Sequence, residues 1–149
     1  MRLWHYQLLE FLPDAQFKGQ LRELVAIMHD WRDKGATNHI LINRVMDYPK
    51  AELSTYFMLY YSLYHKRYGK TINDKYLDEF YAFRLPYDVD TFKIKGIFNG
   101  WHDTEYLRIC MSNLYEKYKY AKGKSRVTGQ EWRKLLDGYK TITRKKWKV

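Results

Sequence analysis

Apolar side chains recur at steps of three and four residues along much of the chain, which is the pattern of helices with one buried face. The clearest stretch begins after Pro13 and Asp14 and ends at Gly35. Its apolar positions are Phe17, Leu21, Leu24, Val25, Met28 and Trp31. Asp14 is a favourable N-cap and glycine is a common helix stop, so a helix is expected between Asp14 and Gly35.

The same pattern, with start and stop signals, predicts four more helices. They run from Glu52 to Tyr68, from Asn73 or Asp74 to about Phe83, from Asp103 through Tyr118, and onward from the capping box Thr128–Glu131. Residues 37–49 permit one further short helix. Residues 84–100 are the least helical stretch, and the alternation at residues 92–95 allows a small strand at best.

Together these elements predict an all-α fold. We expect one compact domain over residues 1–149, with about five helices, long connecting loops and room for one short hairpin. The 149 residues are 46% hydrophobic, which is enough for a real core and too apolar for a disordered chain. The 15 tyrosines are interpreted first as core and rim, and alternatively as a surface on which bases stack.

Charge is unevenly distributed along the chain. The net charge is +10, and residues 117–149 carry all of this excess, with 12 basic residues against Glu131 and Asp137. Four lysines, at positions Lys117, Lys119, Lys122 and Lys124, follow or interleave with the aromatic stretch 115–120. A basic segment with interleaved aromatics favours a nucleic acid partner, ahead of a membrane surface or a merely solubilising tail.

Several kinds of site find no support in the sequence. Cys110 is the one cysteine and lies among apolar residues, so we expect a buried side chain and a reducing cytoplasm. The five histidines form no metal-binding motif, and there is no phosphate-binding glycine loop. No apolar run approaches the ~18–20 residues of a membrane span, and charged residues interrupt the front apolar stretch, so we expect neither a membrane segment nor a signal peptide.

The strongest candidate chemistry lies at the front of the chain. On the helical wheel Glu23 lies at the border of the buried face, together with Gln16, Gln20 and Ile27, whereas Arg22 falls on the other side. A border carboxylate can be partly desolvated and still reach a ligand. An α-amine titrates at about 7.7–8.0, so part of it is neutral and nucleophilic near pH 7. Arginines can hold phosphate oxygens.

A resemblance to a known family adds to this interpretation. The stretch 8–24, LLEFLPDAQFKGQLREL, resembles the N-terminal motif of the pyrimidine-dimer DNA glycosylases of the phage endonuclease V type: a short arm, then an Asp-led helix with an Arg-Glu pair. The opening MRLWH is similar to the cellular bacterial branch of that family. Similar too are NHILIN at 38–43, MDYP at 46–49, GWHD at 100–103 and NLYEKY at 113–118.

The resemblance implies an all-α enzyme that combines DNA glycosylase and abasic-site lyase activities, hence a hydrolase, lyase and endonuclease of DNA repair. It implies that the α-amine of Met1 is the nucleophile and that Glu23 is the essential carboxylate. Arg2 and Arg22 match the arginines beside the scissile nucleotide. Gln16 stands where the family has a histidine, and it is expected to bind DNA. The partner implied is double-stranded DNA, and no metal or nucleotide cofactor is expected.

Departures from the family pattern keep alternatives open. Arg2 is too bulky for removal of the initiator methionine, so Met1 is expected to stay. Ala26 and Ile27 stand where the family has a third arginine. The sequence therefore also allows a glycosylase for a different lesion, another hydrolase or transferase on a similar scaffold, or a basic helical protein that binds DNA or RNA without chemistry.

Overall fold

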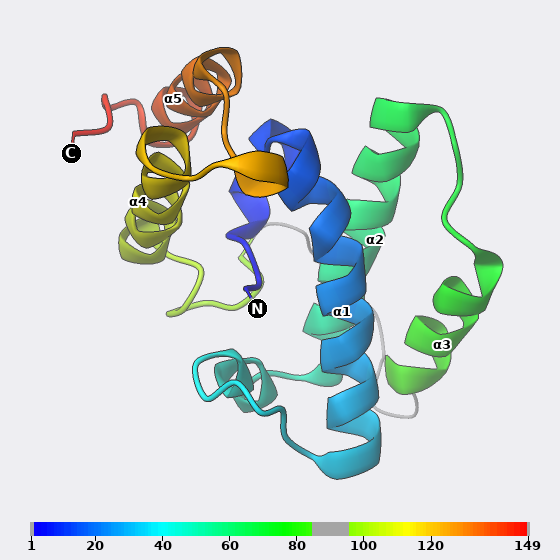
Figure 1. The fold of residues 1–149 in the computed structure, drawn as a ribbon. Coiled ribbons are helices and arrows are strands. Elements are labelled where there is room, and N and C mark those ends of the chain that lie inside the picture. The colour runs from blue at the N-terminus through cyan, green and yellow to red at the C-terminus, as the bar shows by residue number, and fades with distance from the viewer. Residues whose placement is uncertain (1, 85–95, 149) are drawn as a thin grey trace. The chain divides into compact units, whose positions relative to one another are not determined.

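The computed structural model describes residues 2–84 and 96–148, and within these ranges it is built from helices without any strand. The elements in chain order are η1 (Tyr6–Phe11), α1 (Asp14–Lys34), η2 (Ile42–Asp47), α2 (Lys50–Tyr68), α3 (Asp74–Arg84), α4 (Thr104–Lys119), η3 (Gly123–Ser125) and α5 (Gly129–Thr143), where η marks a 3₁₀ helix (Figure 1). The predicted all-α fold is confirmed. The hairpin considered around residues 92–95 lies outside the described residues.

The chain divides into two compact units. Unit 1 contains Met1–Leu3 and Leu21–Asn99, and unit 2 contains Trp4–Gln20 and Gly100–Val149. The first turns of α1 therefore belong to unit 2 and the rest of that helix to unit 1. The expectation of one domain over residues 1–149 stays a prediction.

Unit 1 packs α2 against α3, with aromatic rings at the contact. The rings of Phe57 and Phe80 stack with centroids 4.0 Å apart, and Phe83 meets the edge of Trp31 from α1 at 5.2 Å. At the surface, Glu79 of α3 accepts hydrogen bonds from His29 and Arg32 of α1, at 2.6 and 3.1 Å. Aromatic burial thus holds this unit together, and a small polar cluster aligns α1 with α3.

Unit 2 packs α5 against both η1 and α4. Gly138 of α5 lies directly against the ring of Phe11, so that no side chain fits between the two elements. On the other face the indole of Trp132 stacks on Tyr118 of α4, with centroids 5.6 Å apart. Five of the twelve basic residues of 117–149 lie in these two helices, and the other seven lie in the connection between α4 and α5 or after α5.

Local signals in the sequence locate most helix ends. The Asp103 side chain accepts from the Tyr106 amide at the start of α4, and Thr128 and Glu131 form the expected capping box. Gly35 and Gly69 both have positive φ, at 73° and 65°, where helices α1 and α2 end. One detail was wrong: Asp14 is the first residue of α1 rather than the residue before it.

The buried face of α1 is rotated from the one predicted. Gln16, Gln20 and Ile27 are buried, whereas Leu21 and Trp31 keep part of their surface in water. Two polar contacts account for part of the difference, since the amide of Trp4 donates to Oε1 of Gln20 at 2.9 Å and Nε2 of Gln16 donates to the Ser125 carbonyl at 2.9 Å. Glu23 is half-buried and Arg22 is exposed, as the wheel predicted.

Candidate active site

Arg2 lies against the middle of α1 within unit 1. The backbone amide of Arg2 donates a hydrogen bond of 3.2 Å to Oε2 of Glu23. The bond joins residues 21 positions apart, so it depends on the arm turning back along the helix. Glu23 is positioned by α1, whose residues around it pack into the core through Leu24, Ile27 and Met28.

The surroundings of Glu23 set the state of its carboxylate. Burial raises the pKa of Glu23 above its ordinary value of 4.5, because the charged form loses hydration. The hydrogen bond from the Arg2 amide and the charges of Arg2 and Arg22 lower the pKa of Glu23 and so act against burial. The result is a partly desolvated carboxylate with cationic neighbours, which suits proton transfer and the stabilisation of positive charge.

The arm itself is held by groups that sequence reasoning passed over. Gln20 is fully buried and binds the Trp4 amide, although the helical wheel predicted a position at the border of the buried face. His5 caps η1, because its Nδ1 accepts from the Gln7 amide at 3.1 Å. The available signal was spacing: Gln16, Gln20 and Glu23 follow one another at four and three residues along one stripe of α1.

The remaining predicted site residues are distributed over both units. Arg22 is exposed on α1 in unit 1, next to Glu23 in the chain. Gln16 belongs to unit 2, where its Nε2 donates to the carbonyl of Ser125 at 2.9 Å and the side chain is buried. Four lysines of unit 2 reach solvent: Lys117 is half-exposed, and Lys119, Lys122 and Lys124 are exposed. The structure thus brings Arg2 to Glu23, and DNA contacts by the other residues stay predictions.

A polar cavity of about 350 Å³ in unit 2 contains two histidines that sequence reasoning weighed only as metal ligands or loop residues. His5 and His102 lie ring against ring with centroids 5.2 Å apart. The Nδ1 of His102 accepts from the Tyr6 amide at 3.1 Å, and that of His5 accepts from Gln7. Each ring thus uses its Nδ1 as an acceptor, as the tautomer with hydrogen on Nε2 does. Burial lowers the pKa of His5 to about 4, which keeps it uncharged.

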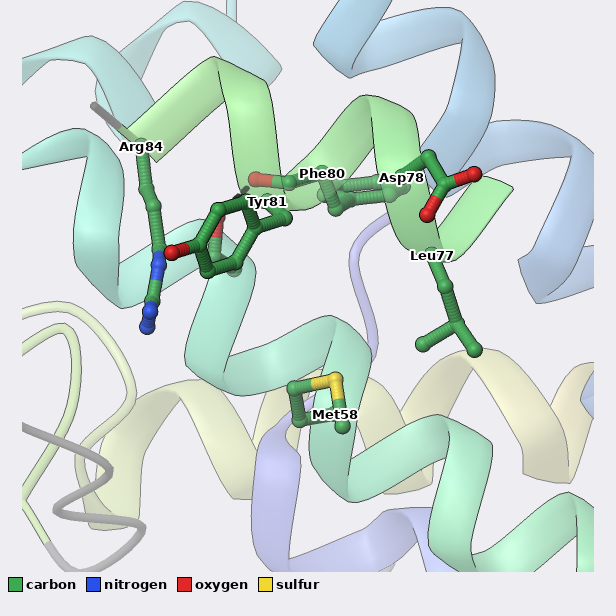
Figure 2. Close-up of a pocket in the computed structure, with 7 residues that line it drawn as sticks. Met58, Leu77, Asp78, Phe80, Tyr81 and Arg84 are labelled. Atoms are coloured by element: carbon green, nitrogen blue, oxygen red, sulfur yellow. Dashed lines mark hydrogen bonds between the residues drawn. The ribbon is translucent and has the colours of Figure 1, made fainter. Parts of the chain in front are cut away.

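Unit 1 contains an apolar pocket of about 410 Å³, and Figure 2 shows the side chains that line it. Met58 of α2 and Leu77, Phe80 and Tyr81 of α3 line it. The guanidinium of Arg84 lies over the ring of Tyr81, 4.8 Å from its centroid. Neither Arg2 nor Glu23 lines this pocket or the cavity of unit 2, so neither space holds the candidate catalytic carboxylate.

The described part of the chain contains neither a cluster of metal-binding side chains nor a helix that could span a membrane. Over residues 2–84 and 96–148, no three side chains of the types His, Cys, Asp or Glu gather as a metal site would require. In the same ranges no helix is both long enough and apolar enough to cross a bilayer.

Comparison with known proteins identifies the chain at the family level. A family model described as pyrimidine dimer DNA glycosylase matches residues 1–76, just over half of the chain. The matched stretch includes Arg2, Gln16, Arg22 and Glu23. Searches of curated proteins and of solved structures each gave no match.

Proposed function

The chain belongs to the pyrimidine dimer DNA glycosylase family, and we propose that it excises a damaged base and then cuts the strand through a Schiff base on its N-terminal α-amine. The observation that carries this proposal is the hydrogen bond between the Arg2 amide and Glu23. We further propose that the enzyme belongs to the cellular bacterial branch and acts on double-stranded DNA in the cytoplasm.

Covalent geometry supports the pairing of amine and carboxylate. Standard bond lengths keep the nitrogens of consecutive residues within about 4 Å of each other. The Arg2 nitrogen is 3.2 Å from Oε2 of Glu23. If the mature chain begins at Met1, its amine is therefore tethered within roughly 7 Å of that carboxylate. A substrate sugar that contacts one of these groups is then within reach of the other.

In the proposed reaction the neutral amine attacks C1′ of the deoxyribose of the damaged nucleotide. The bond between C1′ and the base breaks, and the base leaves with a proton. The sugar ring then opens at the C1′–O4′ bond, O4′ takes a proton from water, and a protonated imine remains between the amine and C1′. The amine has to be neutral for the attack, and an α-amine meets this condition near pH 7 far better than a lysine does.

Glu23 then acts twice. Its carboxylate stabilises the positive charge on the sugar, and it accepts the proton that leaves C2′. Loss of that proton breaks the C3′–O bond, so the 3′ phosphate departs and the strand is cut. Water finally hydrolyses the imine and releases the amine. Every step uses groups of the protein, the DNA and water, so the proposal calls for no cofactor.

Binding of the DNA is assigned to the basic residues. Arg2 and Arg22 flank Glu23 in unit 1 and are proposed to hold the phosphates beside the reacting sugar. Lys117, Lys119, Lys122 and Lys124 of unit 2 are proposed to contact the backbone farther away. Gln16 joins this contact through the Ser125 segment to which it is bonded.

Borohydride trapping tests the proposal. The protein is mixed with abasic DNA, or with DNA that contains a dimer, and borohydride reduces any imine to a stable adduct. We expect the adduct on the N-terminal peptide, with its loss in Glu23→Gln and after N-acetylation, and its retention in Glu116→Gln, which changes an exposed glutamate of α4. Intact mass before the reaction verifies an unformylated Met1.

The alternatives give different outcomes in the same experiment. Salt-sensitive DNA binding without an adduct or a cut strand would leave a protein that binds without chemistry, which the +10 charge of residues 117–149 favours as the second candidate. An adduct with abasic DNA and none with dimer DNA would retain the amine mechanism and assign a different lesion.

A further inference from the structure

Two aliphatic side chains stand next to each other in solvent in the turn after α1. Ile40 is 86% exposed and Leu41 is 85% exposed, more than any other exposed large hydrophobic side chain in the described residues. Single exposed apolar residues are ordinary, but an adjacent pair extended into water marks a contact surface. Both residues belong to unit 1, as do Arg2 and Glu23.

Hydrogen bonds among the residues on either side of the pair stabilise the turn that presents it. The Thr37 amide and hydroxyl both donate to Oδ1 of Asn43, at 2.8 and 2.9 Å, and Nδ2 of Asn43 donates back to the Thr37 carbonyl at 3.2 Å. The Thr37 hydroxyl also accepts from the His39 amide at 3.0 Å. The tip is therefore preformed, and a contact made by it loses little conformational entropy.

Buried neighbours fix the direction of the tip. Directly after the pair, Ile42 and Val45 of η2 are buried in unit 1. Figure 1 shows this segment, in cyan, turning back from the lower end of α1. At this point of the chain Ile42 and Val45 are buried in the core, whereas Ile40 and Leu41 stay in solvent.

The charge around the pair suits a polyanion. Between Asp33 and Asp47 the chain has no acidic residue, whereas it has Lys34 and Arg44, both exposed, of which Lys34 lies 3.7 Å from the Asp30 carboxylate. An apolar tip with a cationic surround matches DNA, whose phosphates flank an apolar stack of bases.

We propose that Ile40 and Leu41 form a wedge that enters the base stack of duplex DNA beside the damaged nucleotide. The inference rests on the proposed function, since a nucleotide inside a duplex has to leave the stack before an amine can reach its C1′. Apolar wedges of isoleucine or leucine unstack a base step and kink the duplex, and the buried apolar surface offsets part of the cost of unstacking. The wedge opens the step, and Arg2 and Glu23 act on the nucleotide that it releases.

A second copy of the chain fits the pair less well as an occupant. Stable protein interfaces bury about 1,200–2,000 Å² in total, far more than two side chains at a tip supply. The cationic residues around the tip would also face their own copies, which disfavours a symmetric contact.

The test separates unstacking from chemistry. In the Glu23→Gln background, 2-aminopurine placed next to a dimer in duplex DNA brightens when its step is unstacked. We expect the Glu23→Gln protein, the parent in this test, to raise this fluorescence. When Ile40→Ala and Leu41→Ala are added to it, most of the rise is expected to disappear. In the protein with Glu23 intact, the same two alanine substitutions are expected to lower the rate of excision from duplex DNA at least tenfold. The rate at which this variant cuts an abasic site in single-stranded DNA is expected to stay unchanged.

Matched variants keep the test sharp. Ile109→Ala removes an exposed isoleucine of α4 and is expected to change neither readout. Leu41→Met is expected to retain both, and all variants are expected to melt at the temperature of the parent and to have the same mass by light scattering. Unchanged 2-aminopurine fluorescence with bound parent protein, or full duplex excision by the double alanine variant, would overturn the wedge. A fall in mass would assign the pair to a second copy.

The two proposals fail in different ways. Absence of a borohydride adduct together with an Ile40- and Leu41-dependent rise in fluorescence would reject the amine mechanism and retain the wedge. Normal trapping on single-stranded DNA with no effect of the alanine pair on duplex DNA would reject the wedge and retain the mechanism.

Discussion

The amide of Arg2 and the carboxylate of Glu23 are joined by a hydrogen bond of 3.2 Å, within a chain that separates them by 21 positions. This bond places the backbone of Arg2 beside a half-buried carboxylate whose pKa is raised by burial. The neighbouring charges Arg22 and Glu23 are not unusual by themselves, because charged side chains on a helix are ordinarily solvated. The contact between Arg2 and Glu23 is what makes this part of the helix a candidate site.

The first prediction concerns Glu23→Gln. Glutamine keeps a side-chain oxygen that can accept from the Arg2 amide, so the free energy of unfolding is expected to change by less than about 0.5 kcal/mol. The carboxylate is lost, and single-turnover cutting of abasic DNA is expected to slow by roughly 10²–10⁴. Rates from rapid quench and melting by calorimetry measure the two effects. Cutting at the parental rate would exclude Glu23 from the chemistry.

The second prediction concerns pH and rate. The reaction requires ionised Glu23, and its raised pKa means that the rate falls, as pH is lowered, around a midpoint above 4.5. At higher pH the rate is expected to rise until the amine is neutral, at about 7.7–8.0. Single-turnover rates across this range give both midpoints. An acid midpoint at or below 4.5, or one that persists in Glu23→Gln, would contradict the assignment.

The third prediction concerns His5 and acid stability. The folded pKa of about 4 lies below the ordinary 6.5, so the folded protein favours neutral His5. Its contribution is fully present above pH 6.5 and is lost as pH falls toward 4. The loss amounts to about 1.4 kcal/mol per pH unit, or on the order of 3 kcal/mol in total. Urea unfolding at several pH values measures it.

A matched variant isolates this effect. His5→Asn retains an acceptor for the Gln7 amide but does not titrate, so its stability is expected to be lower at pH 7 and flatter between pH 6.5 and 4. Equal slopes for the parent and His5→Asn would show that His5 does not carry the acid sensitivity.

The fourth prediction concerns the contact of Gly138 with Phe11. A Cβ at position 138 would meet the phenyl ring far inside contact distance. Alanine gains about 1 kcal/mol of helix propensity over glycine, but overpacking of this kind costs about 1–3 kcal/mol. Gly138→Ala is therefore expected to lower the melting temperature. With Phe11→Ala already present the same change is expected to be stabilising, and a cycle of the four proteins measures the coupling.

The fifth prediction concerns the salt dependence of DNA binding. Replacement of Lys117, Lys119, Lys122 and Lys124 by alanine removes four phosphate contacts. The slope of log affinity against log salt is then expected to fall by up to about 3.6, since each contact contributes about 0.9. Fluorescence anisotropy with a labelled duplex measures this slope. The control replaces four lysines of unit 1, Lys50, Lys66, Lys70 and Lys75, with the same loss of net charge.

The control decides between a surface and a general charge effect. A smaller change in slope is expected from the unit 1 variant. Equal changes from both variants would mean that the total charge, rather than the segment from Lys117 to Lys124, drives binding.

The sequence by itself determined the class of fold, most helix ends and the family. Asp103 and the box of Thr128 and Glu131 were predictable because a cap bonds an amide within three residues of itself. The family motif was predictable for a related reason, because its residues are contiguous in the chain.

Only the tertiary structure decided which distant groups meet. The burial of Gln20, the contact of Arg2 with Glu23 and the stacking of His5 on His102 each join residues from 16 to 97 positions apart. Periodicity along one helix reports which face is apolar, but it does not report which other segments cover the helix. Contact with the N-terminal arm buries Gln20, so the buried face of α1 differs from the apolar face of the sequence. The exposure of Ile40 and Leu41 has the same origin, because only packing tells an outward apolar side chain from one in the core.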